Sequence, residues 1–340
     1  MSAEGTISFT NKAVDRETVE GMIANGDYMV IAGDEKVLAS LPSGNWIAGT
    51  IPYFMTVDGG KVDQDKLYVN VISGFASNNV PRLTLYDVNS ISRVAQEAPE
   101  HGLTILMLPA SSEVHLSYAQ NAPDYPNMYF SPIIGWIAGM HLDELGERSA
   151  KVGFGPAAGL LSDTQAAAIH IPLPEHQVAN IKIVNLFEPG DGPTIRFPKN
   201  GFSVENCNVD GSEWSFADYI KEHNIDTRLP LVANYSGVMV NVSIQEVADA
   251  EVNLYAPVFP DVEYRFAKPV DDYVTEFNKA LPSTDTGNIA YSCNCILNFL
   301  YSELEGKKTG TLTGPMTFGE IAYQLLNQTL VYLTLDNANS

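Results

Sequence analysis

The segment LTILMLP, residues 103–109, is a continuous apolar run, and it constrains the fold more than any other feature of the chain. Its length is typical of a strand, and the lack of polar alternation indicates a strand that is covered on both faces. A strand-like segment, 67–75, comes before it, and the segment 90–98 between them has helical apolar spacing. This order predicts a parallel pair of strands joined by a crossover helix. The following segment, 111–123, has the pattern of a short helix that ends at Pro123.

Strand and helix patterns continue along the rest of the chain. The predicted elements are two short strands within 29–42, a hairpin over 180–202, helices over 214–224 and 271–281, strands over 237–244 and 252–259, and a strand that turns into a helix over 289–306. This order predicts a mixed α/β or α+β fold of two β-rich subdomains whose mixed sheets are flanked by helices. We expect an N-terminal half at 1–190 and a C-terminal half at 191–340.

The composition of the chain limits its partners. Acidic residues outnumber basic ones by 41 to 19, and the formal net charge of −22 is spread over both halves. Such a surface repels phosphate backbones and anionic lipid headgroups, so we expect no nucleic-acid and no membrane partner. Three cysteines give no disulfide framework and are typical of a reducing compartment. With no signal-peptide pattern and no apolar run of ~20 residues, we expect a soluble, cytoplasmic protein.

Two motifs of the middle region have ordinary interpretations. The stretch VGFGPAAG, 152–159, has the glycine spacing of a dinucleotide fingerprint, but the segment before it is a poor strand. We therefore interpret it as a glycine-rich connection. His170 and His176 flank a proline-restrained segment next to Glu175, which is the beginning of a metal site without its remaining ligands. Surface or hydrogen-bonded histidines explain the pair better, and we predict no metal site.

Ser111 and His115 are spaced by four residues, one helical turn. A serine nucleophile needs a base within hydrogen-bond reach, and the local sequence lacks the G-x-S-x-G pattern of a strained nucleophile elbow. A serine at 111 or 112 that caps the helix after Pro109 is the better interpretation. We therefore predict no catalytic residue here.

Cys293 and Asn294 lie at the predicted turn from a strand into a helix. The free N–H groups and the positive dipole end of such a turn favour a bound anion or a thiolate. The alternative is that Cys293 is a small buried residue of the core. Trp46 and Tyr53 flank a loop that contains Gly49, which suits the aromatic wall of a small-molecule pocket. Aromatic residues of a core have the same pattern.

Near the C-terminus, Thr317 and Glu320 precede the apolar run IAYQLL with the spacing of a helix capping box. On this interpretation Glu320 begins a helix, with Gly319 in its first turn. A contact between Glu320 and a ligand is the alternative, and the sequence allows both roles.

The C-terminal block resembles the end of FIST domains, which occur in bacterial signalling proteins and in some F-box proteins. The resemblance lies in the pair Ser292-Cys293 at a strand end, in Phe-Gly-Glu-Ile at 318–321, and in Asn327 and Thr329 at the start of a final strand. The N-terminal stretch VLASLPSGNWIAGT is similar to the early strand pair of the same domains, less closely. One departure is plain: the family has Gly-Arg shortly after its cysteine, where this chain reads Cys-Asn-Cys-Ile-Leu-Asn.

The resemblance implies a non-enzymatic sensory module that binds a small ligand, with an amino acid or a derivative as the expected class. Glu320 would bind the ligand's amine, and backbone amides near Asn294 would bind its carboxylate. The candidate ligand-binding residues are Cys293, Asn294, Gly319, Glu320, Thr329, Trp46 and Tyr53. Output would pass through a signalling protein partner, and no cofactor is identified.

Three other functions remain open at this stage. One is an enzyme with Cys293 as nucleophile, activated by His115, His141 or His170. Another is a haem-binding gas sensor with a histidine as axial ligand, since some FIST-like proteins bind haem. The last is a module that only binds a protein partner.

Overall fold

The computed structural model describes residues 5–157, 159–235, 238–280 and 289–338. Strands dominate the described residues and helices are few and short, so the predicted mixed, β-rich fold is confirmed. Most of the helices predicted to flank the sheets are missing from the described residues. The helices are α1 (Arg16–Ala24), α2 (Glu35–Leu38), α3 (Glu113–Asn121), α4 (Phe216–Glu222), α5 (Tyr273–Ala280) and α6 (Ile296–Tyr301), with single 3-10 turns at Ile91–Arg93, Ala122–Asp124 and Leu142–Glu144.

The strands form four six-stranded sheets and one three-stranded sheet. In spatial order, the first sheet is β1 (Ser8–Val14), β6 (Leu67–Ser73), β2 (Tyr28–Gly33), β3 (Trp46–Thr50), β10 (Val152–Phe154) and β11 (Leu161–Ser162). The second is β26 (Gln324–Leu326), β25 (Glu320–Ala322), β9 (Ile133–Ala138), β8 (Gly102–Pro109), β12 (Ala166–Pro172) and β7 (Arg82–Tyr86). The third is β13 (Gln177–Val184), β27 (Leu330–Asn337), β23 (Ile289–Cys295), β24 (Gly314–Thr317), β4 (Tyr53–Thr56) and β5 (Gly59–Val62).

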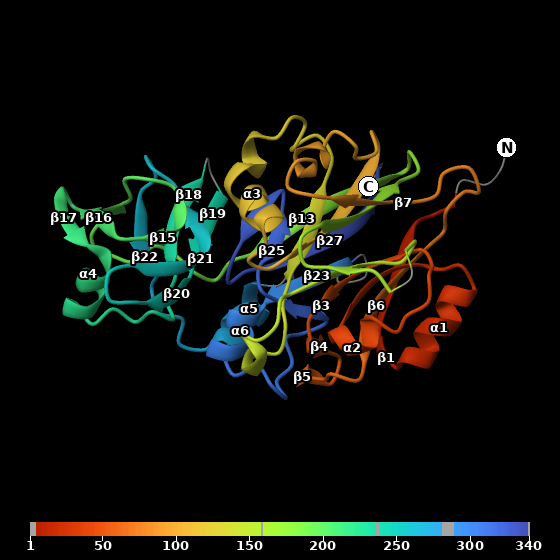
Figure 1. The fold of residues 1–340 in the computed structure, drawn as a ribbon, viewed down its shortest axis with the longest axis horizontal. Helices are drawn as coiled ribbons and strands as arrows, with labels where there is room; N and C mark the ends of the chain where they lie inside the picture. Colours follow the sequence, from red (N-terminus) through yellow and green to blue (C-terminus); the bar gives the residue numbers. More distant parts are fainter. Residues whose placement is uncertain (1–4, 158, 236–237, 281–288, 339–340) are drawn as a thin grey trace.

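The remaining two sheets come from the middle of the chain. One is β17 (Ser212–Ser215), β16 (Asn206–Val209), β14 (Ile195–Arg196), β22 (Tyr264–Phe266), β18 (Leu231–Tyr235) and β19 (Val238–Val242). The other is β15 (Gly201–Val204), β21 (Val252–Val258) and β20 (Ile244–Val247). We call residues 195–266 the β lobe; it lies at the left of Figure 1, apart from the three sheets of the body.

The C-terminal strands belong to the body rather than to the β lobe. β25 pairs with β9, β24 pairs with β4, and β27 pairs with β13. The chain therefore leaves the body near residue 190, builds the β lobe, and returns to the body at 289–337. A single division at residue 190 would cut through two of the body sheets.

The apolar run at 103–109 is β8, whose eight residues are all buried as predicted. Its parallel partner is β9, and α3 is the connection between them. The predicted pairing with 67–75 is wrong, because β6 lies in another sheet between β1 and β2. The segment 90–98 forms only a 3-10 turn instead of the predicted helix. The Asp87 carboxylate accepts the N–H groups of Asn89 and Ser90, and this local turn competes with a regular helix.

Three further predictions are wrong. Residues 318–326 form the hairpin β25–β26 instead of a helix; Thr317 ends β24, so it caps nothing. The two halves of 180–202 pair with different strands, β13 with β27 and β14 with β16. The second half of 29–42 is the short helix α2, because the Asp34 side chain accepts the Lys36 N–H as its N-cap.

The longest helices, α1 and α3, have nine residues. At 1.5 Å per residue this is far below the thickness of a bilayer, so no helix in the described ranges can span a membrane.

Candidate functional site

A cavity of about 740 Å³ lies between the β lobe and the body. The residues that follow the C-terminal ends of β8 and β9 line part of this cavity. Ligands commonly bind at this edge in sheets with parallel strands. Its apolar lining includes Leu116, Met140, Phe202, Leu254, Leu297 and Phe318. Two of these, Phe202 and Leu254, come from β15 and β21 of the β lobe. A space of this size and character suits a small organic molecule.

The turn from β8 into α3 forms one edge of this cavity. Ser112 is the N-cap of α3: its Oγ accepts the His115 N–H at 3.2 Å and donates to the Pro109 carbonyl at 2.7 Å. The predicted helix cap is therefore confirmed, with Ser112 in that role. Ser111 has a φ of 62°, a left-handed conformation that is uncommon for serine, and lines the cavity.

His115 belongs to the lining of the cavity, and its ring carries a donor that has no protein partner. The Ser111 N–H donates to His115 Nδ1 at 3.1 Å, and since a backbone amide can only donate, the ring proton is on Nε2. Nε2 is buried and has no hydrogen-bond partner. The side chain is 6% exposed and packs edge-on against Phe202, with ring centroids 5.7 Å apart. Burial lowers the pKa of His115 to about 4, so the ring is neutral near pH 7.

Polar groups gather at the rim of the cavity, where they pair with one another. Arg148 donates to Glu144 at 3.2 Å, and the Ser149 hydroxyl donates to Asp163 at 2.9 Å. Arg148 is the one basic side chain among the lining residues that the structure describes. The one basic side chain of the described lining therefore already has an acidic partner.

The predicted site residues Gly319, Glu320 and Thr329 lie next to one another in the structure, but they are not part of the cavity lining. Glu320 is completely buried, and its Oε2 accepts the Thr329 N–H at 3.3 Å and the Thr329 hydroxyl at 2.8 Å. The Thr317 hydroxyl lies 3.3 Å from Oε1, and Gly319 precedes Glu320 in the same turn. Burial raises the pKa of Glu320 to about 8. The carboxyl is occupied by protein partners, and its contact with a ligand amine stays a prediction.

Cys293 and Asn294 lie inside β23, and the chain turns into α6 only after Cys295. The Asn294 Oδ1 accepts the Cys295 N–H at 2.8 Å and the Asn298 amide at 2.9 Å, so the Cys295 amide has a protein partner. The Cys293 thiol donates to the Gly135 carbonyl at 3.3 Å. Burial raises the pKa of Cys293 well above its ordinary value, which disfavours the thiolate.

Trp46 and Tyr53 are buried in the body, and neither is among the lining residues of the cavity. A Cβ at Gly155 would lie 2.7 Å from the Trp46 ring, so this glycine of the fingerprint-like stretch serves packing. Ala158, which takes the last position of the fingerprint spacing Gly153-x-Gly155-x-x-Ala158, lies outside the described residues. Tyr53 accepts the Leu142 N–H at its hydroxyl, 3.1 Å away. Both aromatic residues thus have the contacts of core residues.

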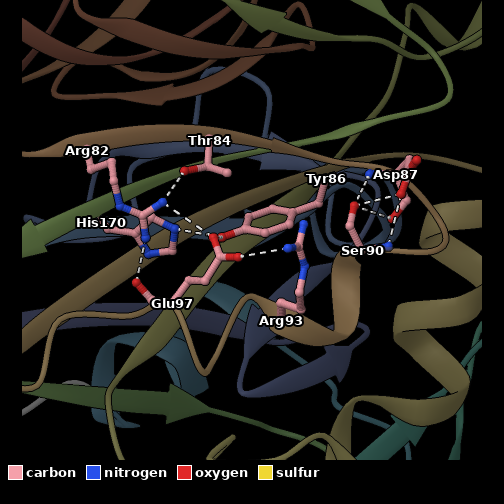
Figure 2. Close-up of polar contacts among 8 residues, drawn as sticks. All are labelled: Arg82, Thr84, Tyr86, Asp87, Ser90, Arg93, Glu97 and His170. Atoms are coloured by element: carbon pink, nitrogen blue, oxygen red, sulfur yellow. Dashed lines mark hydrogen bonds and ion pairs between the residues drawn. The ribbon is translucent and has the colours of Figure 1, made fainter.

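His170 takes part in a hydrogen-bonded cluster at the edge of the second sheet (Figure 2). Its Nδ1 lies 2.9 Å from the Thr104 hydroxyl and its Nε2 lies 2.9 Å from the Tyr86 hydroxyl. The Tyr86 hydroxyl also donates to Glu97 at 2.8 Å, and Glu97 pairs with Arg93. These bonds tie β7, β8 and β12 to the segment that leads into β8.

A metal site at the histidines has no support from this arrangement. Both ring nitrogens of His170 are occupied by protein partners, and His176 lies near Thr6 instead, at 3.4 Å. Within the described ranges, no group of three or more His, Cys, Asp or Glu side chains is arranged to hold a metal ion.

Sequence reasoning considered Ser111 and His115 but missed the rest of the cavity. The i, i+4 spacing was the available signal, whereas Phe202, Arg148 and Phe318 come from distant segments that meet only in the fold. No curated protein matches the chain. Residues 14–336 match the model of a family of unknown function (DUF6976), and the chain belongs to that family.

Proposed function

We propose that this protein is a non-enzymatic sensory protein that binds a small molecule in the cavity beside His115. One observation carries the proposal: a cavity of about 740 Å³ with largely apolar walls lies between the β lobe and the body, and a few polar residues, among them Ser111, His115 and Asn253, belong to its lining. A space of this size with mostly apolar walls and a few polar groups is typical of a small-molecule site. The amino acid or derivative implied by the FIST-like resemblance is the starting class of ligand.

The position of the cavity gives a ligand a way to be sensed. Phe202 and Leu254 belong to the β lobe, whereas Leu116 and Leu297 belong to α3 and α6 of the body. A molecule that contacts both sets stabilises one arrangement of lobe and body over others, and a partner that reads this arrangement would respond to the ligand. We propose that the partner is a signalling protein and that the protein acts in the cytoplasm.

The alternative functions have less support. A cysteine nucleophile needs a thiolate within reach of substrate, and Cys293 is 1% exposed with a raised pKa. An axial haem ligand needs an unprotonated nitrogen that faces the iron. His115 already uses its unprotonated Nδ1 to accept the Ser111 N–H, so Nε2 carries the proton.

The proposal is tested by comparing the native mass of freshly purified protein with its denatured mass. We expect the native mass to exceed the denatured mass by the mass of one bound molecule per chain, and this excess mass to be lost on denaturation. Leu116→Trp fills the cavity from α3, and Gln120→Trp on the same helix, away from the lining residues, is the matched control.

The excess should disappear in Leu116→Trp and remain in Gln120→Trp, with both variants folded by circular dichroism. An excess that is equal in all three proteins would place the molecule elsewhere and contradict the proposal. Equal native and denatured masses, together with no binding of added methyl naphthyl ketone in isothermal titration calorimetry, would contradict it as well.

A further inference from the structure

The β lobe is joined to the body by two connecting segments, 185–194 and 267–272, that pair with each other. Pro189 and Ala267 form an antiparallel bridge between them. A small apolar cluster, separate from the main core, covers the same place and contains Phe187, Val232 and Ala267. The two segments therefore form one paired attachment of the lobe.

A network of buried side-chain amides lies beside this attachment. The Asn185 and Asn241 amides each donate to the other's carbonyl oxygen, both at 3.0 Å. Asn241, on β19 of the lobe, also donates to the Asn327 carbonyl at 3.0 Å. The Ser243 hydroxyl donates to Gln328 Oε1 at 2.7 Å. We call these five residues and the two connecting segments the junction.

The hydrogen bonds between the lobe and the rest of the described chain gather at this junction. They involve the connecting segments or the turn at Asn327 and Gln328. Across the cavity, no hydrogen bond joins the described residues of the two walls, and the aromatic contact there is the edge-on packing of Phe202 on His115. Because hydrogen bonds are directional and apolar contacts are not, the junction fixes one side of the lobe and leaves the cavity side free to shift.

The polar residues of the lobe wall do not tie the lobe to the body. The Ser203 hydroxyl donates to Glu251, and the Asn253 amide donates to a glutamate of β20, both within the lobe. Gln245 and Tyr255 also line this wall, and their side chains have no hydrogen bond to the described residues of the body. The lobe wall is therefore free to move as one piece relative to α3 and α6.

The strand order places the far part of this wall away from the junction. β20 begins directly after Ser243, and its sheet runs in the order β15, β21, β20. With about 4.8 Å between neighbouring strands, β15 lies about 10 Å from β20. Phe202 and Ser203, which line the cavity from β15, are thus displaced more than β20 by a small rotation at the junction.

We infer that the β lobe rotates as a unit about the junction and thereby opens and closes the cavity. The Asn185–Asn241 amide pair is the fixed point of this hinge motion. A molecule that contacts both walls favours the closed arrangement, because it buries apolar surface of both. Closure on a bound molecule rests on the proposed function, whereas the rotation belongs to the fold and does not need a ligand.

Double electron–electron resonance between two spin labels measures the rotation. The mouth pair joins Lys199→Cys, three residues before Phe202 of the lobe, to Glu147→Cys, next to Arg148 of the body lining. Both positions are exposed and lie outside the cavity lining. The three native cysteines are buried, so the labels attach to the introduced ones.

The junction pair is the matched control for the mouth pair. It joins Lys182→Cys on β13 to Val238→Cys on β19, which are exposed and lie three residues before Asn185 and Asn241. Dialysis until the native and denatured masses agree gives the ligand-free protein. In this protein we expect the mouth distances to be broader than the junction distances by about 2 Å or more, and equal widths would overturn the inference.

Added methyl naphthyl ketone should shorten the mouth distance by about 2 Å or more and leave the junction distance unchanged within about 1 Å. Binding of the ketone in calorimetry without this change overturns the closure. If the ketone does not bind, that result counts against the proposed function, and the widths in the ligand-free protein still decide the rotation.

A substitution at the amide pair tests its role as the fixed point. Asn241→Ala should broaden the junction distances, whereas Asn206→Ala, at an exposed position of the same lobe, should leave them unchanged. An unchanged junction width in Asn241→Ala overturns that role. Should Asn241→Ala fail to fold, Asn185→Ala removes the same pair from the body side.

Discussion

Replacement of Glu320 by glutamine should make the protein more resistant to alkaline pH. In its protonated form the Glu320 carboxyl can donate to Thr317, while its other oxygen accepts from Thr329, 2.8 Å away at the hydroxyl. A glutamine amide reproduces both bonds, because its NH₂ replaces the O–H. We therefore expect Glu320→Gln to change the free energy of unfolding by less than about 1 kcal/mol near pH 5.

The magnitude at higher pH follows from the raised pKa. The pKa of Glu320 rises from 4.5 to about 8 in the folded protein. Between these values the folded state holds a proton that the unfolded chain has released, so stability falls as pH rises, by about 1.4 kcal/mol per pH unit. The whole window corresponds to about 5 kcal/mol, which the wild-type protein loses by pH 8 and the glutamine variant keeps.

Urea unfolding of both proteins between about pH 5 and pH 9 measures this difference. Groups other than Glu320 titrate in both proteins, so the difference between the two curves isolates Glu320. Glu100→Gln, at an exposed position, is the matched control and should give a curve parallel to the wild type. Parallel curves for Glu320→Gln, or a loss of several kcal/mol at pH 5, would refute the reasoning.

Four further outcomes are expected. Tyr86→Phe removes the hydroxyl that meets both His170 and Glu97 and should cost about 1–3 kcal/mol in urea unfolding; a loss below about 0.5 kcal/mol would contradict the described cluster. The pKa of His170 is lowered to about 3 in the folded protein, so the stability that it contributes above pH 6.5 is lost as pH falls towards 3. In urea unfolding, His170→Gln should therefore show a weaker loss of stability with acid than the wild type, and an equal loss would contradict this expectation. Gly135→Ala places a Cβ 1.7 Å from the Leu106 carbonyl and should lower the melting temperature strongly, whereas Gly21→Ala on the open face of α1 should stabilise by about 0.5–1 kcal/mol. The three cysteines are buried and should resist Ellman's reagent until the protein is denatured; rapid labelling of Cys293 in the folded state would support the enzyme hypothesis instead.

Local signals in the sequence were sufficient for several elements. The run at 103–109 gave the buried strand β8, and the Ser-rich start of 111–123 gave α3 with its cap. The change from strand to helix in 289–306 was predicted as well, although it follows Cys295 and leaves Cys293 inside β23. In each case the pattern is contained within about ten residues, so it does not depend on the rest of the fold.

Where a sequence pattern was compatible with two different structures, only the tertiary contacts decided between them. Thr317 and Glu320 have the spacing of a capping box, yet β9 offers a free edge to residues 320–322, and pairing there makes a hairpin. The cavity could not be predicted for a related reason. His115 was visible as an i, i+4 partner of Ser111, but its ring contact with Phe202, 87 residues away in the chain, exists only in the fold.

The most direct test of the account is a crystal of the protein soaked with a brominated form of methyl naphthyl ketone. Anomalous scattering from bromine locates the probe without reference to any assumed pose. The account predicts a bromine peak inside the cavity, between Phe202 and Leu254 of the β lobe and Leu116 of α3. A peak elsewhere, or no peak at all, would contradict it.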